Sequence, residues 1–162
     1  MTTRTDDAMH YWARLTHEGR HLLAEFPDCP GCQTFARANE DIATEAAEAL
    51  IGWLESHLAH GEAPPKPVAR ARGRGLLVPV PATLAVRLQL RWARQERGLS
   101  QAEFGKRLGV TRQQVNLFES KGANPRLTSL ERIAASLGLE VEITFRDRET
   151  SGPAQLPRSR CK

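Results

Sequence analysis

The chain has 162 residues, of which 40% are hydrophobic and 26% charged, and it carries a formal net charge of +4. This length allows one good core or two small ones. No apolar run of about 18 residues is present to span a membrane, and residues 1–7 lack the apolar stretch of a secretory signal. We therefore expect a soluble, cytoplasmic protein that makes no membrane contact.

The net charge hides an asymmetry between the two halves of the chain. Residues 1–63 hold 4 Lys/Arg and 11 Asp/Glu, whereas residues 64–162 hold 19 Lys/Arg and 8 Asp/Glu. The basic half suits a nucleic-acid backbone, because neutralised phosphates release their counterions. The acidic half suits a basic partner, unless it is only a solvated surface with uneven charge.

Three strands are expected at the start of the acidic half. Residues 11–15 and 22–26 flank a turn at residues 17–19, which indicates a β-hairpin. After a tight loop at residues 27–31, residues 34–36 supply the third strand.

A helix follows from Glu40, because apolar side chains recur at helical spacing as far as Leu58. Asn39 is the expected cap of this helix. A last strand over residues 76–81 completes a small β-β-β-α-β domain, residues 8–81. Such a unit is too small for a secure core of its own, so we expect it to dimerise or to pack on a partner.

A proline- and arginine-rich segment, residues 62–75, separates the helix from the last strand. It contains Pro64-Pro65-Lys66-Pro67 and Arg70-Ala71-Arg72-Gly73-Arg74-Gly75, which excludes regular structure. We expect a mobile, solvated loop; contact of its four basic residues with DNA is the alternative.

The basic half begins with an amphipathic helix over residues 82–97, in which Leu84, Leu88 and Trp92 share one face. Three capping boxes, in which each side chain satisfies a free backbone N–H of the first turn, mark further helix starts. They are Ser100 with Glu103, Thr111 with Gln114, and Thr128 with Glu131. Gly109 marks the turn between the first two capped helices, and the last helix ends at Gly138.

The first two capped helices predict a helix-turn-helix. Phe104 and Leu108 share one face, as do Val115 and Phe118, so the two apolar faces are buried together. A small helical bundle with a polar surface is the alternative. The flanking helices favour sequence-specific DNA binding instead.

The exposed face of the second capped helix carries side chains that match base edges. Amides pair with adenine and a guanidinium with guanine in the major groove. We expect Gln113, Gln114 and Asn116 to read bases, and Arg112 to contact either a base or a phosphate.

Three further residues are candidate phosphate contacts. Gln101 and Thr111 lie where helices begin, and free backbone N–H groups at such places favour phosphate. Lys121 adds a positive charge just beyond the second helix.

Residues 82–139 resemble the lambda-repressor-like, or XRE-type, DNA-binding domain. The resemblance implies a mainly helical DNA-binding domain, residues 82–145, followed by a flexible tail over residues 146–162. It also implies binding of double-stranded, palindromic operator DNA by a homodimer or higher homo-oligomer, with half-sites about ten base pairs apart.

The acidic half resembles HicB-type antitoxins. Residues 25–34, Glu-Phe-Pro-Asp-Cys-Pro-Gly-Cys-Gln-Thr, are similar to the F-P-D-x-P-G-C-x-T segment of that family. Glu48-Ala49-Leu50 is similar to its E-A-L, and Val78-Pro79-Val80-Pro81 to its closing strand. This chain has Ala36-Arg37-Ala38 where family members often carry Gly-Asp-Thr.

The resemblance implies an α+β protein whose N-terminal domain has a partial RNase H-like fold without nuclease activity. That domain would bind and inhibit a small, basic, mRNA-cleaving HicA-type toxin, while the C-terminal domain represses the operon of the pair. Asp28, Glu45 and Glu48 are the candidate toxin-contacting residues. A cytoplasmic protein, nucleoid-associated when bound to its operator, is expected. The alternative is a stand-alone repressor whose N-terminal domain senses a ligand or dimerises.

The chain contains a closely spaced cysteine pair but no recognisable catalytic motif. Cys29 and Cys32 have the spacing of a redox dithiol or half a zinc site, which His57 and His60 could complete. The plain interpretation is a turn with one buried thiol, with Cys161 free. No nucleophile elbow or phosphate-binding loop is present, so we expect no enzymatic activity, no cofactor and no metal.

Overall fold

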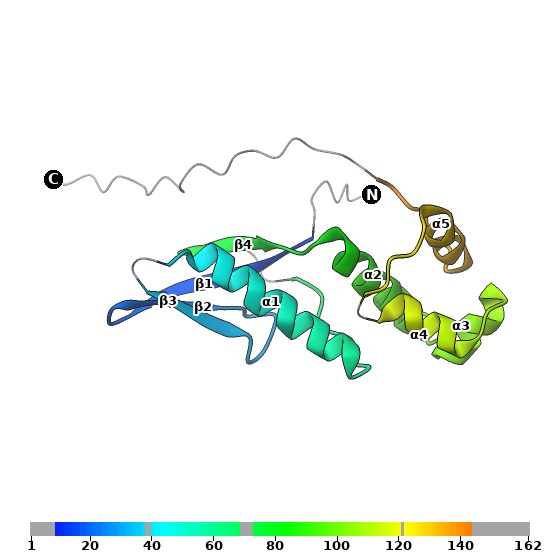
Figure 1. The fold of residues 1–162 in the computed structure, drawn as a ribbon, viewed down its shortest axis with the longest axis horizontal. Coiled ribbons are helices and arrows are strands. Elements are labelled where there is room, and N and C mark those ends of the chain that lie inside the picture. Colours follow the sequence, from blue (N-terminus) through cyan, green and yellow to red (C-terminus); the bar gives the residue numbers. More distant parts are fainter. Residues whose placement is uncertain (1–8, 38–39, 69–72, 121, 144–162) are drawn as a thin grey trace.

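The computed structural model describes residues 9–37, 40–68, 73–120 and 122–143, and its fold is α+β (Figure 1). A 4-stranded sheet with one helix against it is followed by a series of helices. The elements are β1 (His10–Glu18), β2 (His21–Glu25), β3 (Gln33–Arg37), α1 (Ile42–Ala59), β4 (Gly75–Pro79), α2 (Ala82–Glu96), α3 (Gln101–Leu108), α4 (Arg112–Glu119) and α5 (Leu127–Ser136). The expected β-β-β-α-β order and the helical C-terminal half are confirmed.

The sheet has the strand order β3-β2-β1-β4, and all neighbouring strands are antiparallel. β1 lies between the hairpin partner β2, with Leu15 opposite Ala24, and the late strand β4, with Tyr11 opposite Val78. Alternate side chains of a strand point to the same face of the sheet. Tyr11 lies on the face of β1 that packs against α1, in one buried cluster with Leu50.

Two predicted helix caps are wrong. The cap of α1 is Asp41, whose carboxylate accepts hydrogen bonds from the Ala43 N–H (3.1 Å) and the Thr44 hydroxyl (2.8 Å); Asn39 itself lies outside the described residues. α5 begins at Leu127 after Arg126, without a side-chain cap. Thr128 thus lies inside the helix, where a capping residue's extended backbone is not available.

Residues 62–68 form no helix or strand, and several of them are exposed, but two of their carbonyls accept hydrogen bonds from distant elements. The Tyr11 hydroxyl donates to the carbonyl of Pro65 (2.6 Å), and the Trp92 indole N–H donates to that of Pro64 (2.7 Å). Proline lacks an N–H but keeps its carbonyl acceptor. Donors from β1 and α2, far away in sequence, therefore fix the segment.

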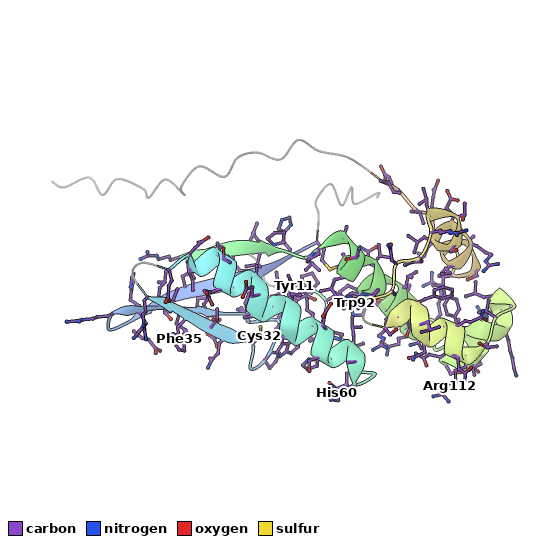
Figure 2. All side chains as sticks on the ribbon, in the orientation of Figure 1. Tyr11, Cys32, Phe35, His60, Trp92 and Arg112 are labelled. Atoms are coloured by element: carbon purple, nitrogen blue, oxygen red, sulfur yellow. The ribbon has the colours of Figure 1, made fainter. Side chains whose placement is uncertain are left out.

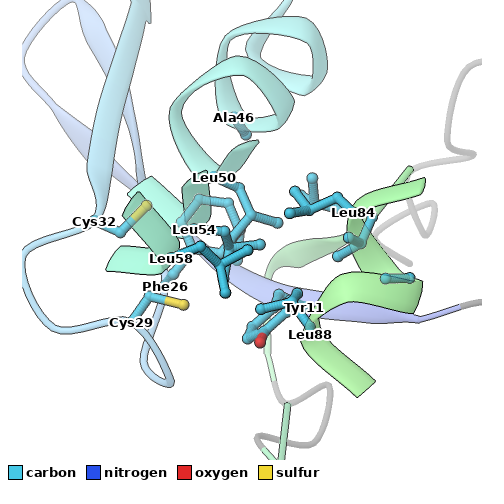
Figure 3. Packing of buried hydrophobic residues seen from close by; sticks show 14 of the residues in the cluster. Tyr11, Phe26, Cys29, Cys32, Ala46, Leu50, Leu54, Leu58, Leu84 and Leu88 are labelled. Carbon is cyan, nitrogen blue, oxygen red and sulfur yellow. The ribbon is translucent and has the colours of Figure 1, made fainter. Parts of the chain in front are cut away.

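α2 belongs to two hydrophobic cores. Its expected apolar face, which includes Leu84 and Leu88, packs with the sheet and α1 (Figure 3). Another side of α2 carries Leu90 and Ala93, which pack with α3, α4 and α5. The predicted domain boundary at residue 81 therefore lies at the start of a helix that both cores share.

Cys29 and Cys32 are both buried in the first core as free thiols, rather than one as expected (Figure 3). Burial raises the pKa of Cys29 to about 12, with the neighbouring Cys32 and Asp28 adding to the effect. Burial likewise raises the pKa of Cys32 to about 11. Because the thiolate is the reactive form of a cysteine, this environment disfavours redox chemistry at both thiols.

Two further features are absent from the part of the chain that the structure describes. No helix there combines the length and apolar character needed to cross a bilayer. No three His, Cys, Asp or Glu side chains there are grouped as metal ligands.

Candidate DNA-binding surface

α3 and α4 begin at the two predicted capping boxes, and both boxes are formed. The Ser100 hydroxyl accepts from the Glu103 N–H, and the Glu103 carboxylate accepts from the Ser100 N–H (2.8 Å). Thr111 and Gln114 repeat the arrangement at α4. Gly109 caps the end of α3 with φ of 68°, a left-handed conformation that glycine adopts without strain. Local sequence thus sets where both helices begin.

A close approach at Gly105 of α3 sets how tightly the two helices are joined. A Cβ atom on Gly105 would lie 2.7 Å from the carbonyl oxygen of Val110 and 3.3 Å from the carbonyl carbon of Thr111. Only a glycine therefore lets the turn pass so close to α3. Gly105 was not among the predicted residues, because a glycine inside a helical pattern gives no sign of what lies against it.

Five of the seven predicted DNA-contacting residues come together on one surface. Thr111, Arg112, Gln113 and Asn116 are exposed and Gln101 is half-buried. With Leu117 they line an open hollow of about 650 Å³ over α3 and α4, which we call the α4 hollow. Figure 2 shows Arg112 on the outer side of the helical half of the molecule.

One predicted residue, Gln114, does not line the α4 hollow. The Gln114 side-chain oxygen accepts from the Thr111 N–H (2.9 Å), so this amide is engaged in the capping box. Lys121 lies outside the described residues. The DNA contacts of both residues stay predictions.

Gln101 links the two helices within the α4 hollow. Its side-chain amide donates to the Asn116 side-chain oxygen (3.4 Å) and to the Glu119 carboxylate (3.1 Å). Because Gln101 sits in the first turn of α3 and Asn116 in the middle of α4, this bridge holds two candidate recognition side chains next to each other. An amide pair of this kind presents both donors and acceptors to a base or a phosphate.

Beneath the α4 hollow, Glu119 is buried with two arginines of α2. The Arg94 guanidinium donates to both carboxylate oxygens of Glu119 (2.6 and 2.9 Å), and Arg91 donates to one of them (3.2 Å). Burial alone would raise the pKa of Glu119, but the hydrogen bonds from Arg94 and Gln101 and the two positive charges outweigh it. The pKa of Glu119 is therefore lower than usual.

Glu119 was also not among the predicted residues, although the sequence contained a signal for it. The signal was its position four residues after Val115, on the apolar side of the helix. A carboxylate at a core position requires buried partners, because an unpaired buried charge is very costly.

Arg87 and Arg91 of α2 connect the end of α4 to the end of α1. Arg91 also donates to the carbonyls of Leu58 (3.2 Å) and Glu62 (2.7 Å). Arg87 donates to the Glu55 carboxylate (3.0 Å) and to the carbonyl of Ser120 (3.1 Å). α4 is thus hydrogen-bonded, through α2, to the N-terminal half.

The three candidate toxin-contacting residues lie in two places. Glu45 and Glu48 lie one turn apart on α1, where Glu48 is exposed and Glu45 half-buried. Asp28 lies in the loop between β2 and β3, and its carboxylate accepts from the Val68 N–H (3.0 Å). Asp28 therefore also anchors the segment at residues 62–68.

Comparison with known proteins concerns the helical half. Residues 90–143 match the helix-turn-helix family model. An uncharacterized HTH-type transcriptional regulator from Methanothermobacter thermautotrophicus (strain Delta H) is 42% identical over 55 residues, which cover 34% of this chain and 80% of that relative. The formed helix-turn-helix and its exposed polar face agree with both similarities. The chain belongs to the helix-turn-helix family of DNA-binding transcriptional regulators.

Proposed function

We propose that this regulator is the antitoxin of a type II toxin–antitoxin pair. Its N-terminal domain binds and inhibits a HicA-type, mRNA-cleaving toxin. Its C-terminal domain represses the operon of the pair by binding a palindromic operator as a dimer.

The α4 hollow carries the DNA-binding part of this proposal. Gln113 and Asn116 are exposed there beside Arg112, and these are the residue types that pair with adenine and guanine in the major groove. The free N–H groups at the start of α4 favour a phosphate near Thr111. Sequence-specific binding through α4 is the function that this arrangement supports best.

The antitoxin part is supported by the resemblance of residues 25–34 and by the turn that they build. The Phe26 N–H donates to the carbonyl of Cys32 (3.1 Å), and the Cys32 N–H donates to that of Cys29 (2.8 Å). Gly31 has φ of 82°, which glycine accommodates without strain. The residues that resemble the HicB segment thus form one compact, hydrogen-bonded turn.

Charge supports a basic partner for the N-terminal domain. α1 contains no Lys or Arg, and Glu45 and Glu48 lie on it after the capping Asp41, whereas Glu55 is already paired with Arg87. Complementary charge speeds the encounter of two proteins and selects the partner. A small RNA-cleaving toxin with a basic surface has the required complementarity.

The test is expression of the small reading frame that neighbours this gene, with and without this chain, followed by co-purification. Growth arrest by the neighbour, relief by this chain and a stable complex of the two are expected. A Glu45→Gln/Glu48→Gln variant should weaken the complex. The exposed pair Glu140→Gln/Glu142→Gln, which removes the same charge from the C-terminal half, should not.

A harmless or non-binding neighbour contradicts the antitoxin proposal. In that case the N-terminal domain is a ligand sensor or a dimerisation unit of a stand-alone repressor. Selection of duplexes from a random library tests the DNA-binding part separately, because a dimer should enrich two half-sites about ten base pairs apart.

A further inference from the structure

Leu117 is an apolar side chain on the DNA-reading face of α4. It is 63% exposed and lies one helical turn beyond Gln113, on the same side of the helix. A single exposed leucine is ordinary on a protein surface. Leu117 differs because it lines the α4 hollow together with Arg112, Gln113 and Asn116. It therefore stands among the polar groups that face base edges.

The major groove offers few matches for such a side chain. Each base pair shows hydrogen-bond donors and acceptors there, and thymine adds the C5-methyl group. A leucine next to an unpaired donor or acceptor would remove water from it without replacing the hydrogen bond, which is unfavourable. Against a methyl group the same leucine buries apolar surface on both sides.

We propose that Leu117 is a specificity-determining residue that contacts a pyrimidine C5-methyl group, at a base pair next to those read by Gln113 and Asn116. This inference rests on DNA recognition by α4. In unmodified DNA the methyl group belongs to thymine. A 5-methylcytosine carries the same group, but with an amino donor in place of the thymine O4 acceptor.

The experiment first selects operator duplexes from an unmodified random library with the full-length protein. At the selected thymine, deoxyuridine is then introduced in one half-site, which removes the methyl group and keeps every hydrogen-bonding group. Loss of one buried methyl should weaken binding of the unchanged protein about four-fold. Leu117→Ala should bind the thymine and deoxyuridine duplexes equally well.

Leu139→Ala is the matched control, since Leu139 is 41% exposed and lies outside α4. It should keep the full response to the methyl group. A third duplex, with 5-methylcytosine paired to guanine at the same position, should bind more tightly than its unmethylated cytosine counterpart if the methyl alone is sensed. If it does not, the contact requires thymine.

Equal methyl responses in the unchanged protein and Leu117→Ala overturn the inference, even when the selected operator is bound specifically. Lack of any enriched thymine next to the bases affected by Gln113→Ala overturns it as well. Failure to enrich any sequence overturns DNA reading by α4 itself, and the inference with it. Far-UV circular dichroism of Leu117→Ala should match that of the unchanged protein, because the side chain is exposed.

Discussion

The guanidinium of Arg94 binds the carboxylate of Glu119 through two hydrogen bonds, from Nε to Oε1 at 2.6 Å and from Nη2 to Oε2 at 2.9 Å. Both residues are buried, with exposed fractions of 7% and 1%. Arg94 lies at the end of α2 and Glu119 at the end of α4. The pair therefore holds α4 against α2, the helix that both hydrophobic cores share.

Replacement of Glu119 by glutamine should destabilise the protein strongly. The neutral amide keeps the shape of the side chain but leaves Arg91 and Arg94 buried without a countercharge. Breaking a buried pair in this way costs about 3–5 kcal/mol, measured as the free energy of unfolding in urea. The control is Glu96→Gln, because the Lys66–Glu96 pair is exposed and should contribute less than about 1 kcal/mol. Equal losses of unfolding free energy in the two variants would show that Glu119 does not stabilise the two buried arginines.

The Glu119 pair should also make stability depend on acid pH. The folded protein holds the pKa of Glu119 below its usual value, so the stabilisation is complete above the unfolded value of about 4.3. It is lost as the pH falls through the lower folded pKa, because the unfolded chain then binds the proton first. The difference in unfolding free energy between the unchanged protein and Glu119→Gln should be constant above pH ~5 and shrink below it. A constant difference down to the lowest pH would refute this.

Replacement of Gly105 by alanine should weaken the helix-turn-helix. Its methyl group would clash with the backbone of Val110 and Thr111, which cannot move aside as a flexible side chain would. We expect a loss of about 1–3 kcal/mol, measured by thermal or urea unfolding. Gly52→Ala is the control, because nothing lies within 4 Å of that position in α1. There alanine should stabilise the helix by about 0.5–1 kcal/mol.

Replacement of Gln113 by alanine should relax the sequence preference at about one base pair. The expected cost on the selected operator is about 1–3 kcal/mol, with little change on random DNA, as measured by fluorescence anisotropy. Gln89→Ala removes the same side chain from an exposed position of α2 and should bind as the unchanged protein does. Equal losses on selected and random DNA would show that Gln113 does not read a base.

The Cys29 and Cys32 thiols should be nearly inert in the folded protein. Their pKa values, raised to about 12 and about 11, leave little thiolate at pH ~8. In a Cys161→Ser background, alkylation by iodoacetamide should be about 100-fold or more slower in buffer than in urea. Fast modification of the folded protein would point to a reactive dithiol instead.

Much of the C-terminal half was predictable, because its signals are short in range. The Ser100–Glu103 and Thr111–Gln114 boxes each join residues three apart. Gly109 ends α3 through its own left-handed backbone conformation. The third box failed at Thr128, since α5 starts at Leu127 without a side-chain cap. A cap motif specifies a helix start only when the backbone of its first residue stays extended, and the sequence does not report that conformation.

The sequence by itself determined the order of strands and helices, the helix-turn-helix and the polar outer face of α4. Hydrophobic periodicity and capping act within a few residues, so short stretches of sequence are enough to specify these features. Only the tertiary structure decided which groups meet across the chain: the carbonyls of residues 62–65 with Tyr11, Arg91 and Trp92, and Glu119 with the arginines of α2. It also brought Leu117 into the α4 hollow with Gln101. Such contacts join residues far apart in sequence, so they follow from how the helices pack and not from the pattern within any one of them.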